Sequence, residues 1–245
     1  FVNDLSMFGL PSDPGTTHPT LAAVGKKYVV LNYGNGSAPM YFQKTTGTKI
    51  GEVTLGAAKA TGAVTSDDCG NMLICNLAKN GEKLEIYKTN DPTKAPEKII
   101  AYTNGLGVDI GARLHVYGDL NGNAVITATP SACQNAIRWI VRNGQVGEPE
   151  NKQFNVGAWG DLDGIAKVAS VDETGQKGAV CDYYADGDCQ MFYFADWATP
   201  TNLVSNPHWG YNPGAIDVRG FNNCRYIALF EMGYWPSWGL NGSIF

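Results

Sequence analysis

One pattern recurs along this sequence: a short apolar run, an Asp-x-x-Gly turn and a second apolar run. The four turns lie at residues 67–70, 119–122, 172–175 and 217–220, and a weaker copy without the aspartate surrounds Gly25. Successive turn aspartates are separated by 52, 53 and 45 residues. Similarity at a nearly fixed period indicates a repeat architecture, so we expect each copy to begin one structural unit.

Each repeat contains about four short segments rich in β-branched and aromatic residues, with no helical pattern between them. Four antiparallel strands per repeat predict a single all-β domain over residues 1–245, a β-propeller with about five four-stranded blades. A β-sandwich is the rival architecture, but it does not require a strand–turn–strand unit at a fixed period. The propeller is therefore favoured.

The number of predicted strands does not decide how the last blade is completed. Residues 1–8 predict a lone strand, and the fifth repeat reaches residues 243–245 where its third strand should begin, so the last blade is incomplete. Either the first strand completes that blade and closes the ring, or the chain continues into further blades. The start at Phe1, without a signal segment, fits either a removed leader or a piece of a longer protein.

Composition supports this class and excludes others. The chain has 30 glycines, 11% aromatic residues and only 17% charged residues, a mixture typical of a turn-rich β protein. The formal net charge of −5 argues against a nucleic-acid partner. No run of eighteen apolar residues occurs, so membrane association would need a lipid anchor outside this chain.

The cysteines and histidines do not form a metal-binding pattern. There is no Cys-x-x-Cys pair and the three histidines are scattered, so we expect no metal and no cofactor. Cys75 and Cys133 are expected to be buried free thiols inside strands. Cys181 and Cys189 flank a segment that predicts a hairpin, which could bring them together.

Strand order predicts where the loops lie. The Asp-x-x-Gly turns all link first and second strands and should share one face of the propeller, whereas second-to-third and fourth-to-first links lie on the opposite face. Six aromatic residues fall in these opposite links and are the candidate ligand-binding residues: Trp159, Trp209, Tyr211, Tyr234, Trp235 and Trp238. They form either an aromatic platform for a ligand or lids packed on the blades. Trp139 and Trp197, in or just after third strands, are expected to be structural.

Catalytic chemistry is not evident in the sequence. Carboxylates expected on the aromatic side are Asp109, Asp161, Asp163, Asp186 and Asp188. No Gly-x-Ser-x-Gly, His-Glu-x-x-His or phosphate-binding glycine loop occurs. We therefore expect no enzyme and no catalytic residue, with a glycan hydrolase using two carboxylates as the alternative.

The segment from Leu84 to Ile99, with its Asn-Asp-Pro-Thr-Lys-Ala-Pro corner, and the segment from Asp67 to Ile74 resemble propeller domains of Bacteroidetes surface lipoproteins. Some of these accompany SusC/SusD-type outer-membrane nutrient importers. The resemblance implies a non-catalytic accessory lipoprotein on the extracellular face of the outer membrane. Such a protein would bind glycan or peptide, or dock on the importer. An adhesive or structural partner module is a further alternative.

Overall fold

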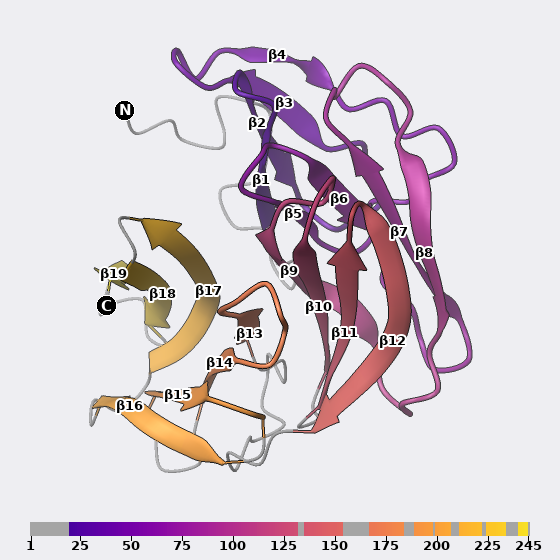
Figure 1. Cartoon of the computed structure of the whole chain (residues 1–245). Helices are drawn as coiled ribbons and strands as arrows, with labels where there is room; N and C mark the ends of the chain where they lie inside the picture. Colours follow the sequence, from indigo (N-terminus) through magenta and orange to yellow (C-terminus); the bar gives the residue numbers. More distant parts are fainter. Residues whose placement is uncertain are drawn as a thin grey trace. The chain divides into compact units, whose positions relative to one another are not determined.

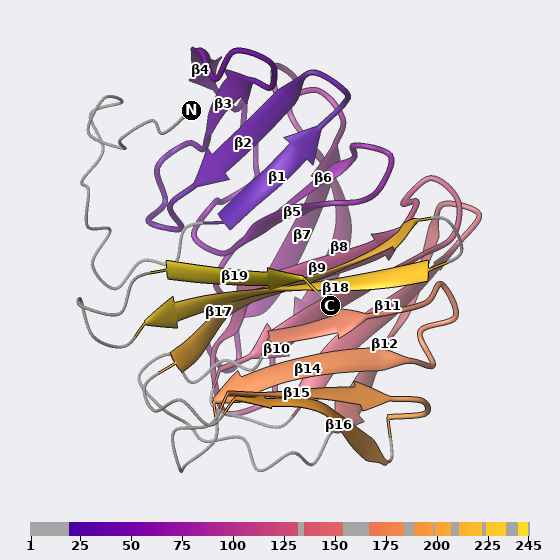
Figure 2. The ribbon, with the colours of Figure 1, turned by 90° about the vertical axis from the view of Figure 1, so that its left-hand side faces the viewer.

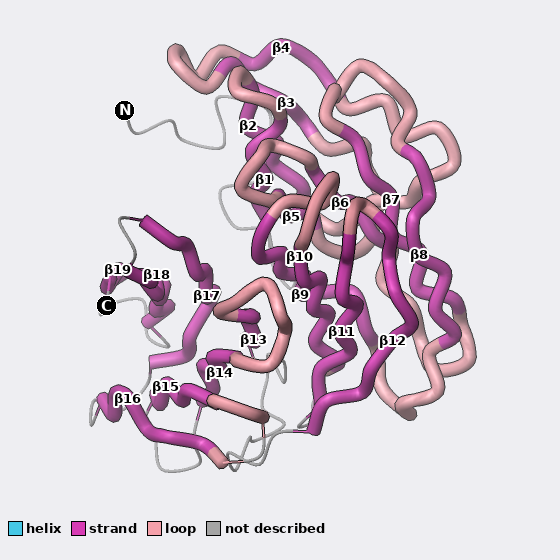
Figure 3. The backbone as a smooth tube through the Cα atoms, in the orientation of Figure 1, coloured by secondary structure: helices cyan, strands magenta, loops and turns pink. Residues whose placement is uncertain are grey.

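The computed structural model describes residues 20–131, 135–153, 167–183, 189–197, 199–206, 211–221, 224–233 and 240–244. These residues form strands and turns, with no helix among them (Figure 3). The chain divides into two compact units, Phe1–Gly107 and Val108–Phe245.

The first unit contains two four-stranded antiparallel sheets in sequential order (Figure 1). Their strands are β1 (Thr20–Val24), β2 (Tyr28–Asn32), β3 (Met40–Gln43), β4 (Lys49–Glu52), β5 (Val64–Ser66), β6 (Met72–Cys75), β7 (Lys83–Thr89) and β8 (Glu97–Thr103).

The second unit contains two further four-stranded sheets and one of three strands, again in sequential order (Figure 2). Its strands are β9 (Ile110–Gly118), β10 (Ala124–Pro130), β11 (Asn135–Arg142), β12 (Gln145–Gln153), β13 (Lys167–Ser170), β14 (Gly178–Tyr183), β15 (Cys189–Phe194), β16 (Pro200–Asn206), β17 (Tyr211–Phe221), β18 (Cys224–Gly233) and β19 (Leu240–Ile244).

These up-and-down sheets are blades of a β-propeller, which confirms the predicted fold class. The described part of the fifth blade is three-stranded, as expected for an incomplete blade. Its third strand begins at Leu240, earlier than predicted, and pairs with Met232. The predicted strand at residues 1–8 lies outside the described residues.

The turn at residues 67–70 links β5 and β6 as predicted. The buried carboxylate of Asp67 accepts hydrogen bonds from the backbone amides of Cys69 (2.9 Å) and Asn71 (2.7 Å), and one from the Asn71 side chain (2.6 Å). Gly70 has a φ of 88° and its carbonyl accepts a 2.8 Å bond from the amide of Gly25. The turn is therefore a structural contact between the first two blades, which explains its residue types.

The turns at 119–122 and 172–175 occupy the same first-to-second links, but the fourth copy does not. Residues 217–220 lie inside β17, and the hairpin instead turns after Phe221, which pairs with Cys224. The alternation of Ile216 and Val218 suits a strand, and the Asn-Asn pair that follows Phe221 suits a tight turn. Asn222 lies 50 residues after Asp172. Counted to this turn, the last repeat has nearly the same length as the others, whereas counted to Asp217 it is only 45 residues long.

Apolar packing between neighbouring sheets supplies the core of each unit. In the first, Ala22, Val24 and Val30 pack with Val64 and Ile74 across the two sheets. A hydrogen bond of 3.0 Å from the amide of Ala23 to the Ser66 hydroxyl joins the same sheets. The core thus buries one face of each inner strand against its neighbour.

Two predictions about core side chains are confirmed. Trp139, in β11, and Trp197, just after β15, are 2% and 5% exposed. Cys75 is buried inside a strand, as expected, and its thiol donates a 3.4 Å hydrogen bond to the carbonyl of Ala63. The predicted hairpin between Cys181 and Cys189 forms, but Cys181 pairs with Met191, so the two cysteines are not cross-strand partners.

Candidate functional site

Backbone register in the second unit brings together the ends from which the aromatic-rich connections leave. Tyr183 pairs with Cys189, and Cys189 pairs with Asn206, so residues 184–188 and 207–210 attach at one end of the fourth blade. Tyr211 pairs with Gly233, so 207–210 and 234–239 attach at one end of the fifth blade. We use the name aromatic rim for the six predicted ligand-binding residues, of which the structure describes Tyr211: Trp159, Trp209, Tyr211, Tyr234, Trp235 and Trp238.

The structure places Tyr211 differently from the prediction. Tyr211 is the first residue of β17 rather than part of the preceding connection. Trp159, Trp209, Tyr234, Trp235 and Trp238 lie outside the described residues. Their role as a ligand platform stays a prediction, supported by the strand ends on which they are carried.

Asp109 is the candidate carboxylate that the structure describes. It directly precedes β9, and its backbone carbonyl accepts a 2.7 Å hydrogen bond from the amide of Ser131 at the end of β10. This contact places Asp109 on the side of the third blade opposite the 119–122 turn, as predicted. Asp161, Asp163, Asp186 and Asp188 lie outside the described residues.

The opposite end of the second unit consists of turns that hold one another. Arg142 donates a 2.8 Å hydrogen bond to the carbonyl of Glu173 in the next blade. The amide of Gly144 donates to the carbonyl of Gly122 at 2.9 Å. Because these polar groups are used in structural contacts, this end offers fewer groups for a ligand than its residue types suggest.

Sequence reasoning missed a cavity in the first unit. It has a volume of about 240 Å³ and belongs to the first blade. Its lining combines apolar, hydroxyl, amide and charged groups: Leu31, Tyr33, Asn35, Ser37, Ala38, Met40, Lys49 and Glu52. The signal that could have found it is the Gly-Asn-Gly-Ser turn directly after an aromatic strand, next to an edge strand that carries two opposite charges.

The described residues offer neither a metal-binding cluster nor a membrane-spanning helix. They hold no cluster of three or more His, Cys, Asp or Glu side chains that could bind a metal ion. The part of the chain that the structure describes also lacks a helix long and apolar enough to cross a membrane.

The fold described above is that of a β-propeller. A family model described as a domain of unknown function, DUF8500, matches residues 1–245, and the chain belongs to this family. No curated protein matches it in sequence.

Three solved structures show the same fold. A DUF4623 family protein from Bacteroides eggerthii aligns with a TM-score of 0.63 at 15% identity over 91% of this chain, which spans about half (52%) of that protein's chain. The Aleuria aurantia lectin, in complex with Fucα1-6GlcNAc, has a TM-score of 0.52 at 11% identity, covering 93% of this chain and 75% of that chain. An exo-1,5-α-L-arabinanase from a bovine ruminal metagenomic library has a TM-score of 0.52 at 12% identity, covering 93% and 92%.

These likenesses establish the fold, and they correct one expectation. The absence of catalytic sequence motifs predicted that the chain is not an enzyme. That prediction is wrong, because an arabinanase has the same fold over nearly its whole chain. Glycosidases act through two carboxylates brought together in space. Two carboxylates on separate blades form no contiguous sequence motif, so the absence of motifs does not exclude a glycosidase.

Proposed function

We propose that this protein recognises glycans at the aromatic rim of its second unit. The observation that carries the proposal is the register Tyr211–Gly233 together with Cys189–Asn206. It attaches two connections at neighbouring strand ends: 207–210, which carries Trp209, and 234–239, which carries Tyr234, Trp235 and Trp238. Tyr211 begins the strand between them. Aromatic rings present flat apolar faces with polar edges, which suit the faces and hydroxyls of sugar rings.

Two of the proteins with this fold support a saccharide over a peptide as the ligand. One is a lectin bound to Fucα1-6GlcNAc, and the other is an arabinanase. Their identities to this chain are 11% and 12%, so the proposal takes only the ligand class from them.

The test is binding of the full chain to a panel of immobilised glycans that includes Fucα1-6GlcNAc and linear 1,5-α-L-arabinan. We expect Trp209→Ala and Trp235→Ala each to weaken binding about tenfold or more, since loss of a central aromatic contact commonly costs at least that much. The control is Leu21→Ala, because Leu21 is an exposed apolar residue of the first unit. Unchanged affinity in both tryptophan variants would remove the rim from the proposal.

A second candidate is glycan hydrolysis at the same rim. Two observations favour it: the arabinanase has the same fold over 92% of its length, and Asp109 lies on the corresponding side of the third blade. The test is release of reducing sugar from 1,5-α-L-arabinan, with Asp109→Asn expected to lower the rate by about 10²-fold or more if it serves as the acid or base. A wild-type protein that binds the polymer without releasing sugar would exclude this activity on arabinan.

We also propose the cell-surface role that the lipoprotein resemblance implies, next to a SusC/SusD-type importer. Its support is the similarity of residues 84–99 to those propellers and the fold shared with the Bacteroides eggerthii protein. In the source organism, protease treatment of intact cells should digest the protein, and crosslinking should join it to the importer. Protection from protease in intact cells would contradict a surface location.

A further inference from the structure

Acidic residues are absent from a long stretch near the start of the sequence. Residues 14–51 contain four lysines and neither aspartate nor glutamate, although the whole chain has a formal net charge of −5. The structure describes this stretch from Thr20 onward, where it forms the first blade. A block of one charge sign on an otherwise acidic protein creates a local positive potential.

The fold gathers these four lysines at one end of the first blade. Lys26 and Lys27 lie in the turn between β1 and β2, and Lys44 begins the turn between β3 and β4. The amide of Lys44 donates a 2.8 Å hydrogen bond to the carbonyl of Lys27, which holds the two turns side by side. Lys49 follows as the first residue of β4. We call this surface the lysine end: Lys26, Lys27, Lys44 and Lys49.

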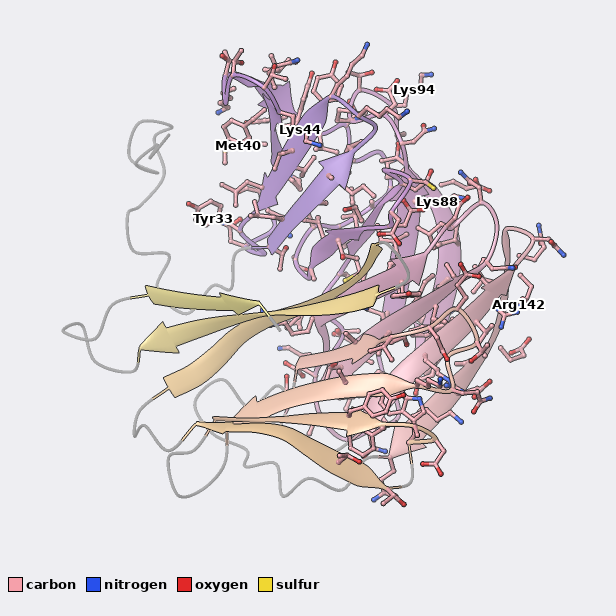
Figure 4. All side chains as sticks on the ribbon, turned by 60° about the vertical axis from the view of Figure 1, so that its left-hand side comes forward. Tyr33, Met40, Lys44, Lys88, Lys94 and Arg142 are labelled. Carbon is pink, nitrogen blue, oxygen red and sulfur yellow. The ribbon has the colours of Figure 1, made fainter. Side chains whose placement is uncertain are left out.

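The positive charge of the lysine end is not neutralised within the first blade. All four lysines are exposed, and none forms an ion pair with another residue in the part of the chain that the structure describes. The first acidic residue after them, Glu52, pairs with Met40 at the far end of β3. Figure 4 shows Lys44 at the opposite end of the first sheet from Tyr33, which follows β2.

The neighbouring turns of the second blade carry their own counter-charges. The Asp67 carboxylate is buried in its turn, which leaves Asp68 as the exposed acid there. In the next turn Lys94 pairs with Asp91 at 3.5 Å. Glu97, the first residue of β8, lies opposite Lys88 in the ladder. The second blade is therefore close to balanced at this end, and the first blade supplies the excess positive charge.

The other side chains at the lysine end suit a saccharide. The 44–48 turn carries three exposed threonines, and the hydroxyls of Thr46 and Thr48 bond each other at 2.8 Å. Ile50, next to Lys49 on β4, is 50% exposed. Ammonium groups donate to carboxylates or sulfates, hydroxyls pair with sugar hydroxyls, and an exposed apolar side chain can contact the C–H face of a sugar ring.

Other polyanions fit this surface less well. A single exposed isoleucine offers little apolar area, whereas surface helices and anchors that bind membranes combine basic groups with a broad apolar face. Nucleic acid would be repelled by the rest of a chain whose formal net charge is −5. The four cations are lysines, flexible point charges that follow spaced anionic groups, rather than arginines, whose planar fork matches single phosphates.

We propose that the lysine end binds an acidic polysaccharide, one that carries carboxylate or sulfate groups along its chain. Successive anionic groups contact Lys27 and Lys44 in the adjacent turns and Lys26 and Lys49 on either side. The surface belongs to the first unit, so it is a second binding surface that does not depend on the aromatic rim.

The experiment measures binding of the full chain to immobilised polygalacturonate and chondroitin sulfate. We expect saturable binding to at least one of them at an ionic strength of about 0.01 M and a loss of about tenfold or more at about 0.15 M, because salt screens exposed charges. Dextran is the neutral polysaccharide, polyglutamate the polyanion without sugar, and vesicles that contain phosphatidylglycerol the anionic membrane. All three should bind more weakly.

Matched double variants assign the binding to the lysine end. Lys27→Gln with Lys44→Gln should weaken binding about tenfold, at about threefold for each exposed ion pair lost. Lys27→Arg with Lys44→Arg should bind as the parent does, because the charges remain. The control is Lys79→Gln with Lys83→Gln, which removes two exposed lysines from the other end of the second blade and changes the net charge equally. The melting temperature should be unchanged in all three double variants.

Three results would overturn the proposal: neither acidic polysaccharide binds saturably, the two glutamine double variants lose affinity equally, or polyglutamate or the vesicles bind as tightly as the acidic polysaccharides. Binding should persist in Trp235→Ala. Its loss in that variant would assign the acidic polysaccharide to the aromatic rim and overturn the assignment to the lysine end, while leaving the proposed function intact.

Discussion

The indole Nε1 of Trp197 donates a 2.9 Å hydrogen bond to the backbone carbonyl of Gly175, the last residue of the 172–175 turn. The same indole stacks on Phe194 with ring centroids 5.8 Å apart. Trp197 itself has a φ of 65°, which few residues other than glycine adopt. Trp197, which follows the third strand of the fourth blade, therefore stabilises the 172–175 turn of the same blade.

Trp197→Phe should destabilise the protein by about 1–3 kcal/mol, because it keeps an aromatic ring but leaves the buried Gly175 carbonyl without this donor. Denaturant unfolding measures the change. A variant as stable as the parent would show that the indole hydrogen bond contributes nothing.

Gly178→Ala should also destabilise the protein, by about 1–3 kcal/mol, because a Cβ at Gly178 would overlap the indole ring of Trp197. The matched control is Gly105→Ala, where a Cβ meets nothing within 4 Å. Gly105→Ala should change the free energy of unfolding by less than about 0.5 kcal/mol. Equal effects of the two substitutions would contradict the packing argument.

Asp67→Ala should cost about 2–4 kcal/mol, since it removes the acceptor of three buried or part-buried hydrogen bonds. Asp119→Ala removes one exposed bond, to the amide of Asn121 at 2.8 Å, and should cost about 1 kcal/mol or less. Thermal and urea unfolding of the two variants compares the same motif in two blades. The ranking would be refuted if Asp119→Ala proved the more damaging change.

Stability should decrease in acid through Glu150. The Arg138 guanidinium, 2.8 Å away and 2% exposed, holds the pKa of the Glu150 carboxyl below its ordinary value of 4.5, and Lys152 adds to the effect. Because the folded pKa is lowered, this contribution is present above pH 4.5 and is lost as pH falls through the folded pKa.

Glu150→Gln should therefore flatten the pH dependence of the free energy of unfolding below about pH 4.5. At neutral pH it should cost only about 1 kcal/mol, because Glu150 is 42% exposed and water screens the pair. Lys94→Met is the control, since Lys94 and Asp91 form a surface pair in the other unit. An unchanged acid slope in Glu150→Gln would exclude this carboxylate as the titrating group.

Cys75 should resist alkylation in the folded protein. Burial raises the pKa of its thiol to about 12, so almost no thiolate exists at neutral pH. Cys69 is exposed and should react. Iodoacetamide labelling followed by peptide mass analysis distinguishes the two, and rapid native labelling of Cys75 would contradict its burial.

Local sequence patterns predicted most of the strands because their causes are local. Short apolar runs such as those of β2 and β6 predict strands whatever the arrangement of the blades. The turns at 67–70, 119–122 and 172–175 were equally readable, because aspartate and glycine satisfy a tight turn within four residues. The same pattern at 217–220 was wrongly predicted to be a turn. Ile216 and Val218 alternate as strand residues do, and β17 continues to Phe221, directly before the Asn-Asn pair.

The site could be predicted only in part. Strand order sufficed to assign the connections that carry Trp209 and Trp235 to one end of their blades, and the register of β17 with β18 agrees. The cavity of the first blade was not predictable, because it depends on a bulge at Ile50 that redirects Lys49. A bulge depends on the pairing of two strands and has no reliable local sequence signature.

By itself, then, the sequence determined an all-β repeat with a period near fifty residues, because turn chemistry and side-chain alternation act over a few neighbouring residues. Only the tertiary structure decided which polar groups find hydrogen-bond partners within the fold. The Asp67 carboxylate is satisfied within its own turn, whereas the Tyr33 hydroxyl is buried without a partner among the described residues. That difference depends on which atoms meet across strands and sheets, and residue type alone does not encode it.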